Sequence, residues 1–271
     1  MRGARPERAL DAIVRRVLGT DARRGVCVAI SGGPDSVALA SLVDRLVREA
    51  GGDAVFAFVD HGTRAGALQD ECVVQSIGTR LGRRVRVARL QASRDDEATL
   101  RALRYDALGR IAAAEGCAAV VTAHTAEDQT ETVLLALFRG AGFAGLAGIA
   151  ERRAFGDGIA LVRPLLRVAR DELQVELRHS GLPYALDPTN DDLRYRRNAL
   201  RAHLAALRRD FPRLDRAVAR YAAIARAEIA ATPTGERRRA LRARLAAADA
   251  RDVSLALIDA VLEREGDPGP P

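Results

Sequence analysis

Lysine is absent from this sequence, since all 43 basic residues of the 271-residue chain are arginine. This absence excludes mechanisms that need an ammonium group from the protein, such as Schiff-base catalysis or phosphate binding by a Walker A lysine. Cysteine is scarce as well. Cys27, Cys72 and Cys117 lie far apart, and two of them stand in apolar runs. The sequence therefore contains no disulfide framework, CxxC redox pair or zinc pattern, and buried thiols are expected.

Long apolar runs are also missing. No run approaches the ~18 residues that a membrane helix needs, and the N-terminus lacks the apolar stretch of a signal peptide. We therefore expect a cytoplasmic protein without a membrane segment. Hydrophobic residues make up 48% of the chain and charged residues 29%, which suits one large domain, or one large domain and a small one.

The net charge of +7 is concentrated in one region of the chain. Residues 1–193 hold 26 arginines against 26 acidic residues, residues 194–251 hold 16 against 5, and residues 252–271 hold 1 against 5. A local excess of guanidinium groups attracts a phosphate-rich polymer, because each contact releases condensed counterions. A solvated helical face has the same composition, so both interpretations stay open.

Short apolar runs alternate with longer helical patterns through the first 165 residues, which predicts an α/β fold with a doubly wound, mostly parallel sheet. The predicted strands are Val26–Ile30, Ala54–Asp60, Val85–Leu90, Ala119–Ala123 and Ile159–Val162. The predicted helices are Ser36–Ala50, Leu68–Leu81, Glu97–Ala114, Asp128–Arg139 and Arg167–Ser180. Ligands of such sheets bind beyond the carboxyl ends of the strands, so functional residues are expected just after Ile30, Val59 and Ala123.

The chain divides by composition into a catalytic domain over residues 1–185, an arginine-rich helical region over 186–265, and a disordered tail over 266–271. Gly140–Gly148 is expected to be a flexible loop. The helical region begins near Tyr195 and is expected to break at Phe211-Pro212 and again at Thr232–Gly235.

The strongest local motif is SGGPDS, Ser31–Ser36, which follows a predicted strand and opens an apolar helix. Its two glycines let backbone N–H groups approach an anion, and the helix N-terminus adds a favourable dipole. The motif therefore predicts a phosphate-binding loop. An ordinary strand-to-helix turn would explain the glycines, but not the two serines and the aspartate beside them.

A second group of polar residues, His124–Thr132, follows the predicted strand Ala119–Ala123. Asp128, Glu131 and Thr132 are spaced three and four apart, so they share one helix face and could meet a metal ion or a substrate ammonium group. Acidic residues in a first helical turn also serve as caps, and that alternative stays open.

The segment Asp60-His61-Gly62-Thr63-Arg64 follows the second predicted strand in the same register. His61 could contact a nucleotide or a reacting oxygen, although a histidine in this place is often a structural hydrogen-bond partner.

Taken together, these motifs resemble the tRNA(Ile)-lysidine synthetase branch of the PP-loop ATP pyrophosphatases. The matching blocks, which span residues 26 to about 205, are SGGPDS, DHGTR, RALRY, TAHTAEDQTET, RGAGFAGLAGI, RPLL, DPTN and RYRRNALR. The resemblance implies the PP-loop fold, which is Rossmann-like and related to the adenine nucleotide alpha-hydrolases. The chain departs from the usual pattern at Thr63, Thr125 and Glu127, where leucine, histidine and aspartate are common.

By this resemblance, ATP adenylates the C2 oxygen of the wobble cytidine in an isoleucine tRNA with a CAU anticodon, and free lysine then displaces AMP to form lysidine. The implied cofactors are ATP and Mg²⁺. The implied ATP-binding residues are Ser31, Gly32, Gly33, Pro34, Asp35, Ser36 and His61. Asp35 would also help to place the magnesium ion, because a carboxylate beside phosphates usually needs a cation between them.

The residues implied to be catalytic are Asp35, Asp128, Glu131 and Arg197. Asp128 and Glu131 would bind the lysine ammonium group and help to remove its proton. The residues implied to contact the substrate or the tRNA are Arg64, Arg104, Arg139, Asn190, Asn198 and Arg201. For Arg104, a surface ion pair is the alternative.

Three alternatives concern function and length. A tRNA-thiolating enzyme shares the phosphate loop. The types that hold an iron–sulfur cluster or use a persulfide need paired or catalytic cysteines, and the three cysteines of this chain do not have that spacing. A non-catalytic nucleotide- and RNA-binding module would keep the fold without turnover. Many members of the family carry a further C-terminal tRNA-binding domain, so either the arginine-rich helices take that role here or the chain is a truncated form.

Overall fold

The computed structural model describes residues 6–60, 67–90, 97–186 and 196–231. Six strands form one sheet in the order β3-β2-β1-β4-β6-β5. Neighbouring strands are parallel except for β5, which runs antiparallel to β6 at the edge. The strands are β1 Val26–Ala29, β2 Ala54–Asp60, β3 Arg84–Arg89, β4 Ala119–Val121, β5 Arg152–Gly156 and β6 Ile159–Val162.

The doubly wound, mostly parallel sheet expected from the sequence is confirmed. The five predicted strands are present, with ends displaced by at most two residues. Strand β5 was not predicted, because its sequence RRAFG is a short edge strand that alternates exposed and half-buried positions and contains no apolar run.

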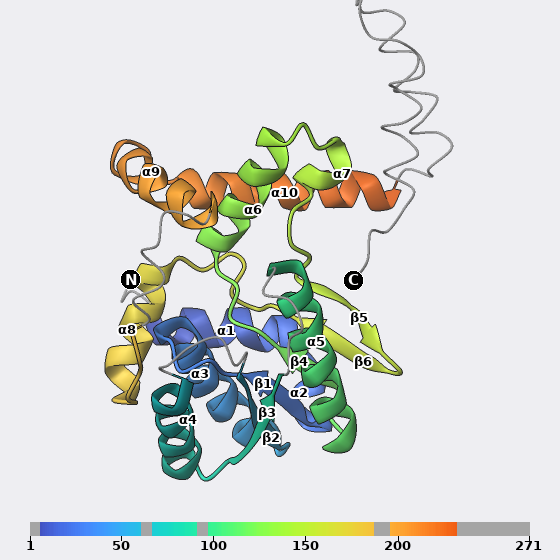
Figure 1. Ribbon diagram of the computed structural model, residues 1–271, viewed down its shortest axis with the longest axis vertical. Coiled ribbons are helices and arrows are strands. Elements are labelled where there is room, and N and C mark those ends of the chain that lie inside the picture. The colour runs from blue at the N-terminus through green and yellow to red at the C-terminus, as the bar shows by residue number, and fades with distance from the viewer. Residues whose placement is uncertain (1–5, 61–66, 91–96, 187–195, 232–271) are drawn as a thin grey trace, which may run out of the picture.

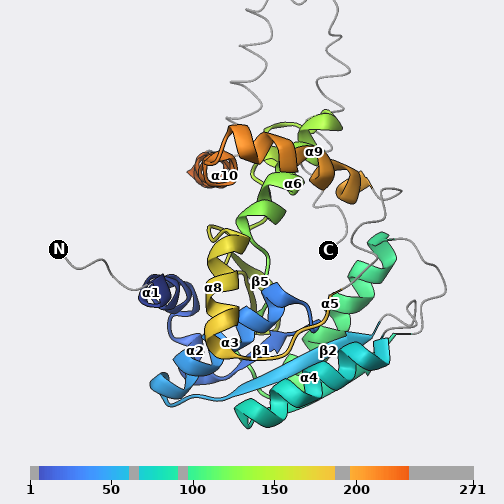
Figure 2. The same ribbon diagram turned by 90° about the vertical axis from the view of Figure 1, so that its left-hand side faces the viewer.

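Helices cover both faces of the sheet (Figures 1 and 2). Side chains alternate along each strand, so Val28 and Phe56 face one hydrophobic cluster, packed under α1, α3, α4 and α8. Cys27 and Val55 face the other cluster, packed under α5. The helices that cover the two faces are α1 Pro6–Leu18, α2 Asp21–Arg24, α3 Pro34–Ala50, α4 Ala67–Leu81, α5 Glu97–Ala114 and α8 Arg170–Ser180.

A second, smaller layer of helices lies beyond the carboxyl ends of the strands (Figure 1). Within it, α10 contacts α6, α7 and α9, and α9 also contacts α6. These helices are α6 Ala126–Phe138, α7 Phe143–Leu146, α9 Arg196–Asp210 and α10 Leu214–Ala231. The layer therefore combines helices from both of the domains predicted from composition, and that division of the chain stays a prediction.

Two details of the helical layer can be compared with expectation. The break at Phe211-Pro212 is confirmed, because α9 ends at Asp210 and α10 begins at Leu214. The flexible loop expected over Gly140–Gly148 is wrong in part: Gly142 is the N-cap of the short helix α7. The expected break at Thr232–Gly235 and the tail over 266–271 lie outside the described residues. None of the described helices is both long and apolar enough to cross a bilayer.

Candidate active site

The phosphate-binding loop predicted from SGGPDS lies between β1 and α3 and is tied together by its two serines. The Ser36 hydroxyl donates to the carbonyl oxygen of Gly33 at 2.8 Å and accepts from the backbone N–H of Ser31 at 3.2 Å. Gly32 has a φ of +84°, a backbone conformation that residues with a Cβ rarely adopt. Gly33 is the N-cap of α3, a helix of 17 residues, so the positive end of its dipole lies at this loop.

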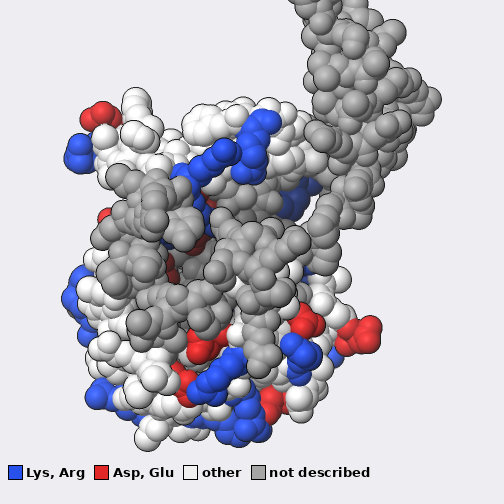
Figure 3. All heavy atoms as spheres, viewed as in Figure 1, with Lys and Arg blue, Asp and Glu red and all other residues white. Residues whose placement is uncertain are grey.

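A cavity of about 900 Å³ opens between this loop and the helical layer. Acidic atoms show in the hollow between the two layers (Figure 3). Its walls bring together β1, the start of α3, the end of β4 and the starts of α6, α8 and α9. The lining residues are Ala29, Ser31, Gly33, Pro34, Asp35, Ser36, Arg104, Thr122, Ala123, His124, Asp128, Arg170, Gln174, Arg197, Asn198, Arg201 and Ala202.

Asp128 has two separate roles at the start of α6. Its Oδ2 accepts from the backbone N–H of Thr125 at 2.9 Å, and the Thr125 hydroxyl completes a capping box with the backbone of Asp128. Its Oδ1 accepts from Nη2 of Arg170 at 3.0 Å and of Arg201 at 3.3 Å. Burial alone would raise the pKa of Asp128, but Arg170, His124 and the Thr125 N–H outweigh burial and lower it. The capping alternative is confirmed, and the carboxylate also faces the cavity.

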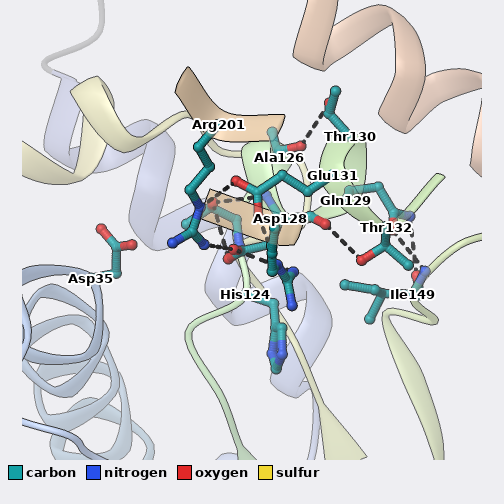
Figure 4. Close-up of polar contacts among 12 residues, drawn as sticks. Asp35, His124, Ala126, Asp128, Gln129, Thr130, Glu131, Thr132, Ile149 and Arg201 are labelled. Atoms are coloured by element: carbon teal, nitrogen blue, oxygen red, sulfur yellow. Dashed lines mark hydrogen bonds and ion pairs between the residues drawn. The ribbon is translucent and has the colours of Figure 1, made fainter. Parts of the chain in front are cut away.

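Glu131 lies behind the cavity wall and is fully buried. Its Oε2 accepts from Nε of Arg197 at 2.7 Å, and its Oε1 accepts from Nε of Arg201 at 2.7 Å. Arg197 and Arg201 are one turn apart on α9, and both line the cavity. Glu131 therefore fixes the two arginines that close this side of the site, and Figure 4 shows it beside Arg201. Thr132 does not join them, since its hydroxyl donates to the Asp128 carbonyl oxygen.

Arg170, which the sequence analysis did not single out, connects the two acidic sides of the cavity. Its Nε lies 3.0 Å from Oδ2 of Asp35 and its Nη2 lies 3.0 Å from Oδ1 of Asp128. Its backbone N–H also donates to Glu127 at 2.9 Å. Burial lowers the pKa of Arg170, but the surrounding carboxylates raise it above its ordinary value. The available signal was its position just after RPLL, at the start of a helix.

The pKa of Asp35 shifts in the opposite direction to that of Asp128. Burial and the nearby charge of Asp128 raise its pKa above the ordinary value, and the opposing effect of Arg170 does not cancel the shift. A carboxyl group in such a place favours a cation near it. Within the described residues, no group of three or more histidine, cysteine, aspartate or glutamate side chains could hold a metal ion by itself.

His124 lies at the end of β4, below Asp128 (Figure 4). Its Nδ1 is 2.9 Å from the Thr122 hydroxyl. Burial, supported by the positive charges of Arg163, Arg104 and Arg101, lowers the pKa of His124 to about 3, although Asp128 opposes this shift. The imidazole is therefore neutral across the physiological pH range.

The other residues singled out from the sequence fall into three groups. Arg104 and Asn198 line the cavity. Arg139 is exposed at the opposite end of α6 from Asp128, so the structure does not bring it to the cavity. His61, Arg64 and Asn190 lie outside the described residues.

Comparison with known proteins agrees with this geometry. The PP-loop domain model matches residues 6–207. A tRNA(Ile)-lysidine synthase of Methylobacterium sp. strain 4-46 is 37% identical over 254 residues, which cover 88% of this chain and 73% of that protein. The chain belongs to the tRNA(Ile)-lysidine synthase family. A synthase of Thermus thermophilus is 44% identical over 225 residues, but the match covers 80% of this chain and only 42% of the Thermus protein.

The fold of this chain is also found in a solved structure of another enzyme. The U34-tRNA thiolase NcsA from Methanococcus maripaludis superposes with a TM-score of 0.68 at 16% identity, covering 82% of this chain and 79% of that chain. At this identity the likeness concerns the arrangement of the sheet and helices and not the chemistry.

Proposed function

We propose that this chain catalyses the ATP-dependent ligation of lysine to C2 of the wobble cytidine of an isoleucine tRNA with a CAU anticodon. One observation carries the proposal beyond family membership. The phosphate loop, through Asp35, and the acidic start of α6, through Asp128, line the same cavity, and Arg170 contacts both carboxylates at 3.0 Å. A nucleotide on the loop and an amine beside Asp128 would therefore meet in one space.

Neither step of the reaction needs a lysine side chain of the protein itself. In the first step, the C2 oxygen of cytidine attacks the α-phosphorus of ATP, and the bond from that phosphorus to the bridging oxygen of the β-phosphate breaks, which releases pyrophosphate. In the second step, the neutral ε-amine of lysine attacks C2, the C2–O bond breaks, AMP leaves with the oxygen, and the amine loses a proton. Both steps require positioning and charge stabilisation.

The loop residues suit the pyrophosphate that leaves in the first step. The N-terminus of α3 and the serine-tied turn at Ser31–Ser36 offer backbone N–H groups and a positive dipole to phosphate oxygens. Asp35 fits a magnesium ion, because Mg²⁺ is usually held by one or two carboxylates together with phosphate oxygens. When bound there, the ion would neutralise negative charge on the phosphates.

Asp128 is the better candidate of the two acidic residues for the ammonium group of lysine. It lines the cavity, and its side chain is 12% exposed, whereas that of Glu131 is 0% exposed and both of its oxygens accept from arginines. We assign Glu131 the role of positioning Arg197 and Arg201. Those two guanidinium groups face the cavity, where they suit the phosphate of an adenylated intermediate.

Thiolation is not supported by the thiols of this chain. Cys27 lies in the buried core and Cys117 is buried next to it, and burial raises the pKa of both, that of Cys117 to about 11. Cys72 is exposed on α4, and none of the three lines the cavity. A reactive or cluster-binding cysteine needs a thiolate that the site can reach.

Incorporation of radiolabelled lysine tests the proposal. The purified chain is incubated with ATP, magnesium and unmodified isoleucine tRNA, and label in RNA is measured together with AMP release. Label should depend on ATP and on the wobble cytidine, and Asp35→Asn should abolish it. The matched control is Asp215→Asn, at an acidic residue of α10 that is paired with Arg208 away from the cavity. Absence of label while ATP still binds would reject the proposal and favour a non-catalytic module.

A further inference from the structure

A second group of arginines surrounds Tyr105 beside the cavity. The Cζ atoms of Arg101 and Arg153 lie 5.4 Å and 5.8 Å from the centroid of the Tyr105 ring. Nη2 of Arg163 donates to the Tyr105 hydroxyl at 3.4 Å. Arg104 precedes Tyr105 on α5 and lines the cavity. We call these four arginines, at residues 101, 104, 153 and 163, the Tyr105 arginine cluster.

No carboxylate of a described residue forms a salt bridge with any arginine of the cluster. Other arginines of the same elements are paired: Arg152 of β5 lies 2.6 Å from Asp21, and Arg110 of α5 lies 2.9 Å from Asp106. Within the cluster, burial and like charge lower the pKa of Arg163 and of Arg104, although Tyr105 opposes both shifts. Like charges gathered in this way favour an anion among them.

Arg163 is the arginine of the cluster that a nearby anion would stabilise most. It is 3% exposed. Its Nη1 donates to the carbonyl oxygen of Ala150 at 2.9 Å, and its Nε is buried without a hydrogen-bond partner among the described residues. A buried cation without a counter-ion is costly. A guanidinium group is suited to phosphate because its planar donors match two phosphate oxygens.

The cluster extends from the cavity, which Arg104 lines, to Arg153 on the edge strand β5. Helix α5 contacts β1, β2, β4 and β6, and Tyr105 reaches the edge strand by packing edge-on against Phe155 of β5, with ring centroids 5.8 Å apart. The sheet order places β5 three strands from β1, which corresponds to about 14 Å at the usual strand spacing. Phosphates held at Ser31–Ser36 therefore leave the β5 end of the cluster, at Arg153, to a different anion.

We infer that the Tyr105 arginine cluster binds phosphodiester groups of the RNA substrate next to the base that enters the cavity. The inference rests on the proposed function, because it takes RNA as the substrate. Arg104 joins the cluster to the cavity, so a strand whose base lies in the cavity would carry its flanking phosphates across α5 toward β5. The cluster would then fix the position of the strand, and the cavity residues would select the base.

Salt dependence of RNA binding tests the inference. The variants are Arg101→Gln, Arg153→Gln and the double variant, and the control is Arg110→Gln on the same helix. Each lost phosphate contact should reduce the slope of log K against log salt concentration by about 0.7, and the double variant by about 1.4. Arg153→Lys should retain the slope, because it keeps the charge. Unchanged slopes in folded variants would overturn the inference.

Two further measurements on the same proteins separate the possible failures. Titration with ATP distinguishes the source of the phosphate: weakened ATP binding with an unchanged RNA slope would assign the cluster to the nucleotide and overturn the inference. Lysine incorporation separates the inference from the proposed function. If the variants reduce the slope but the unsubstituted chain incorporates no lysine, the RNA contact is supported and lysidine formation is rejected. If the unsubstituted chain incorporates lysine but the variants leave the slope unchanged, lysidine formation is supported and the RNA contact is rejected.

Discussion

Arg170 donates from Nε to Oδ2 of Asp35 at 3.0 Å, although the two residues lie 135 positions apart in the chain. The contact joins the first turn of α8 to the first turn of α3. Since Nη2 of the same guanidinium group reaches Asp128, one side chain separates two carboxylates whose like charges would otherwise face each other across the cavity. This arrangement leads to the first prediction.

Replacing Arg170 by methionine should lower stability and shift the pH dependence of activity. Without the guanidinium group, the pKa values of Asp35 and Asp128 should both rise, so ionising the pair in the folded state becomes costly. The free energy of unfolding should fall by about 1–3 kcal/mol at pH 7 and by less at pH 4.5, where the carboxyls can be protonated. Thermal unfolding at the two pH values measures this difference.

The pH profile of AMP release separates the electrostatic role of Arg170 from simple loss of packing. Its acidic limb should move to higher pH in Arg170→Met and return in part in Arg170→Lys. Arg178→Met, on the exposed side of α8, is the control and should change neither quantity. An unshifted limb in a folded methionine variant would contradict the electrostatic role.

The two roles of Asp128 can be separated by substitution. Thr125→Ala removes the N-cap hydroxyl and should cost about 1 kcal/mol of stability, while the KM for lysine stays within twofold. Asp128→Asn keeps an oxygen that can accept from the Thr125 N–H but removes the charge, so the KM for lysine should rise at least tenfold. Steady-state kinetics at saturating ATP measure both values. Equal effects of the two substitutions on KM would contradict an ammonium contact at Asp128.

Glu131→Gln should loosen α9 without affecting nucleotide binding. The substitution removes the charge that holds Arg197 and Arg201 at 2.7 Å, and α9 has only Leu204 as a buried residue. Amide hydrogen exchange should therefore speed up in α9 and not in α3, and kcat for lysine incorporation should fall at least tenfold while the ATP affinity is retained. Glu228→Gln, at an exposed residue of α10, is the control. Unchanged exchange in α9 would show that Glu131 does not position it.

Much of the fold could be predicted from the sequence, because β1, β2, β4 and the helices between them follow hydrophobic patterns that are local in the chain. The loop at Ser31–Ser36 and the acidic start of α6 could also be predicted, because each is a short polar motif that directly follows a predicted strand. Arg170 could not, because its role depends on carboxylates supplied by two other elements. The pairing of Glu131 with α9 was also hidden, since spacing places an acidic residue on a helix face but does not identify its partner.

The half-buried His124 makes the protein sensitive to acid. Its pKa of about 3 in the folded state lies below the ordinary value of about 6.5. Between these two values the unfolded chain binds a proton that the folded chain does not, so stability falls as the pH drops below about 6.5. The loss should be at most about 1.4 kcal/mol per pH unit.

His124→Gln should reduce the decline in Tm between pH 6.5 and pH 4.5, because glutamine takes no proton. His203→Gln, at an exposed residue of α9, is the control and should decline with the same slope as the original chain. If His124→Gln declines equally steeply, then other groups are responsible for the acid sensitivity.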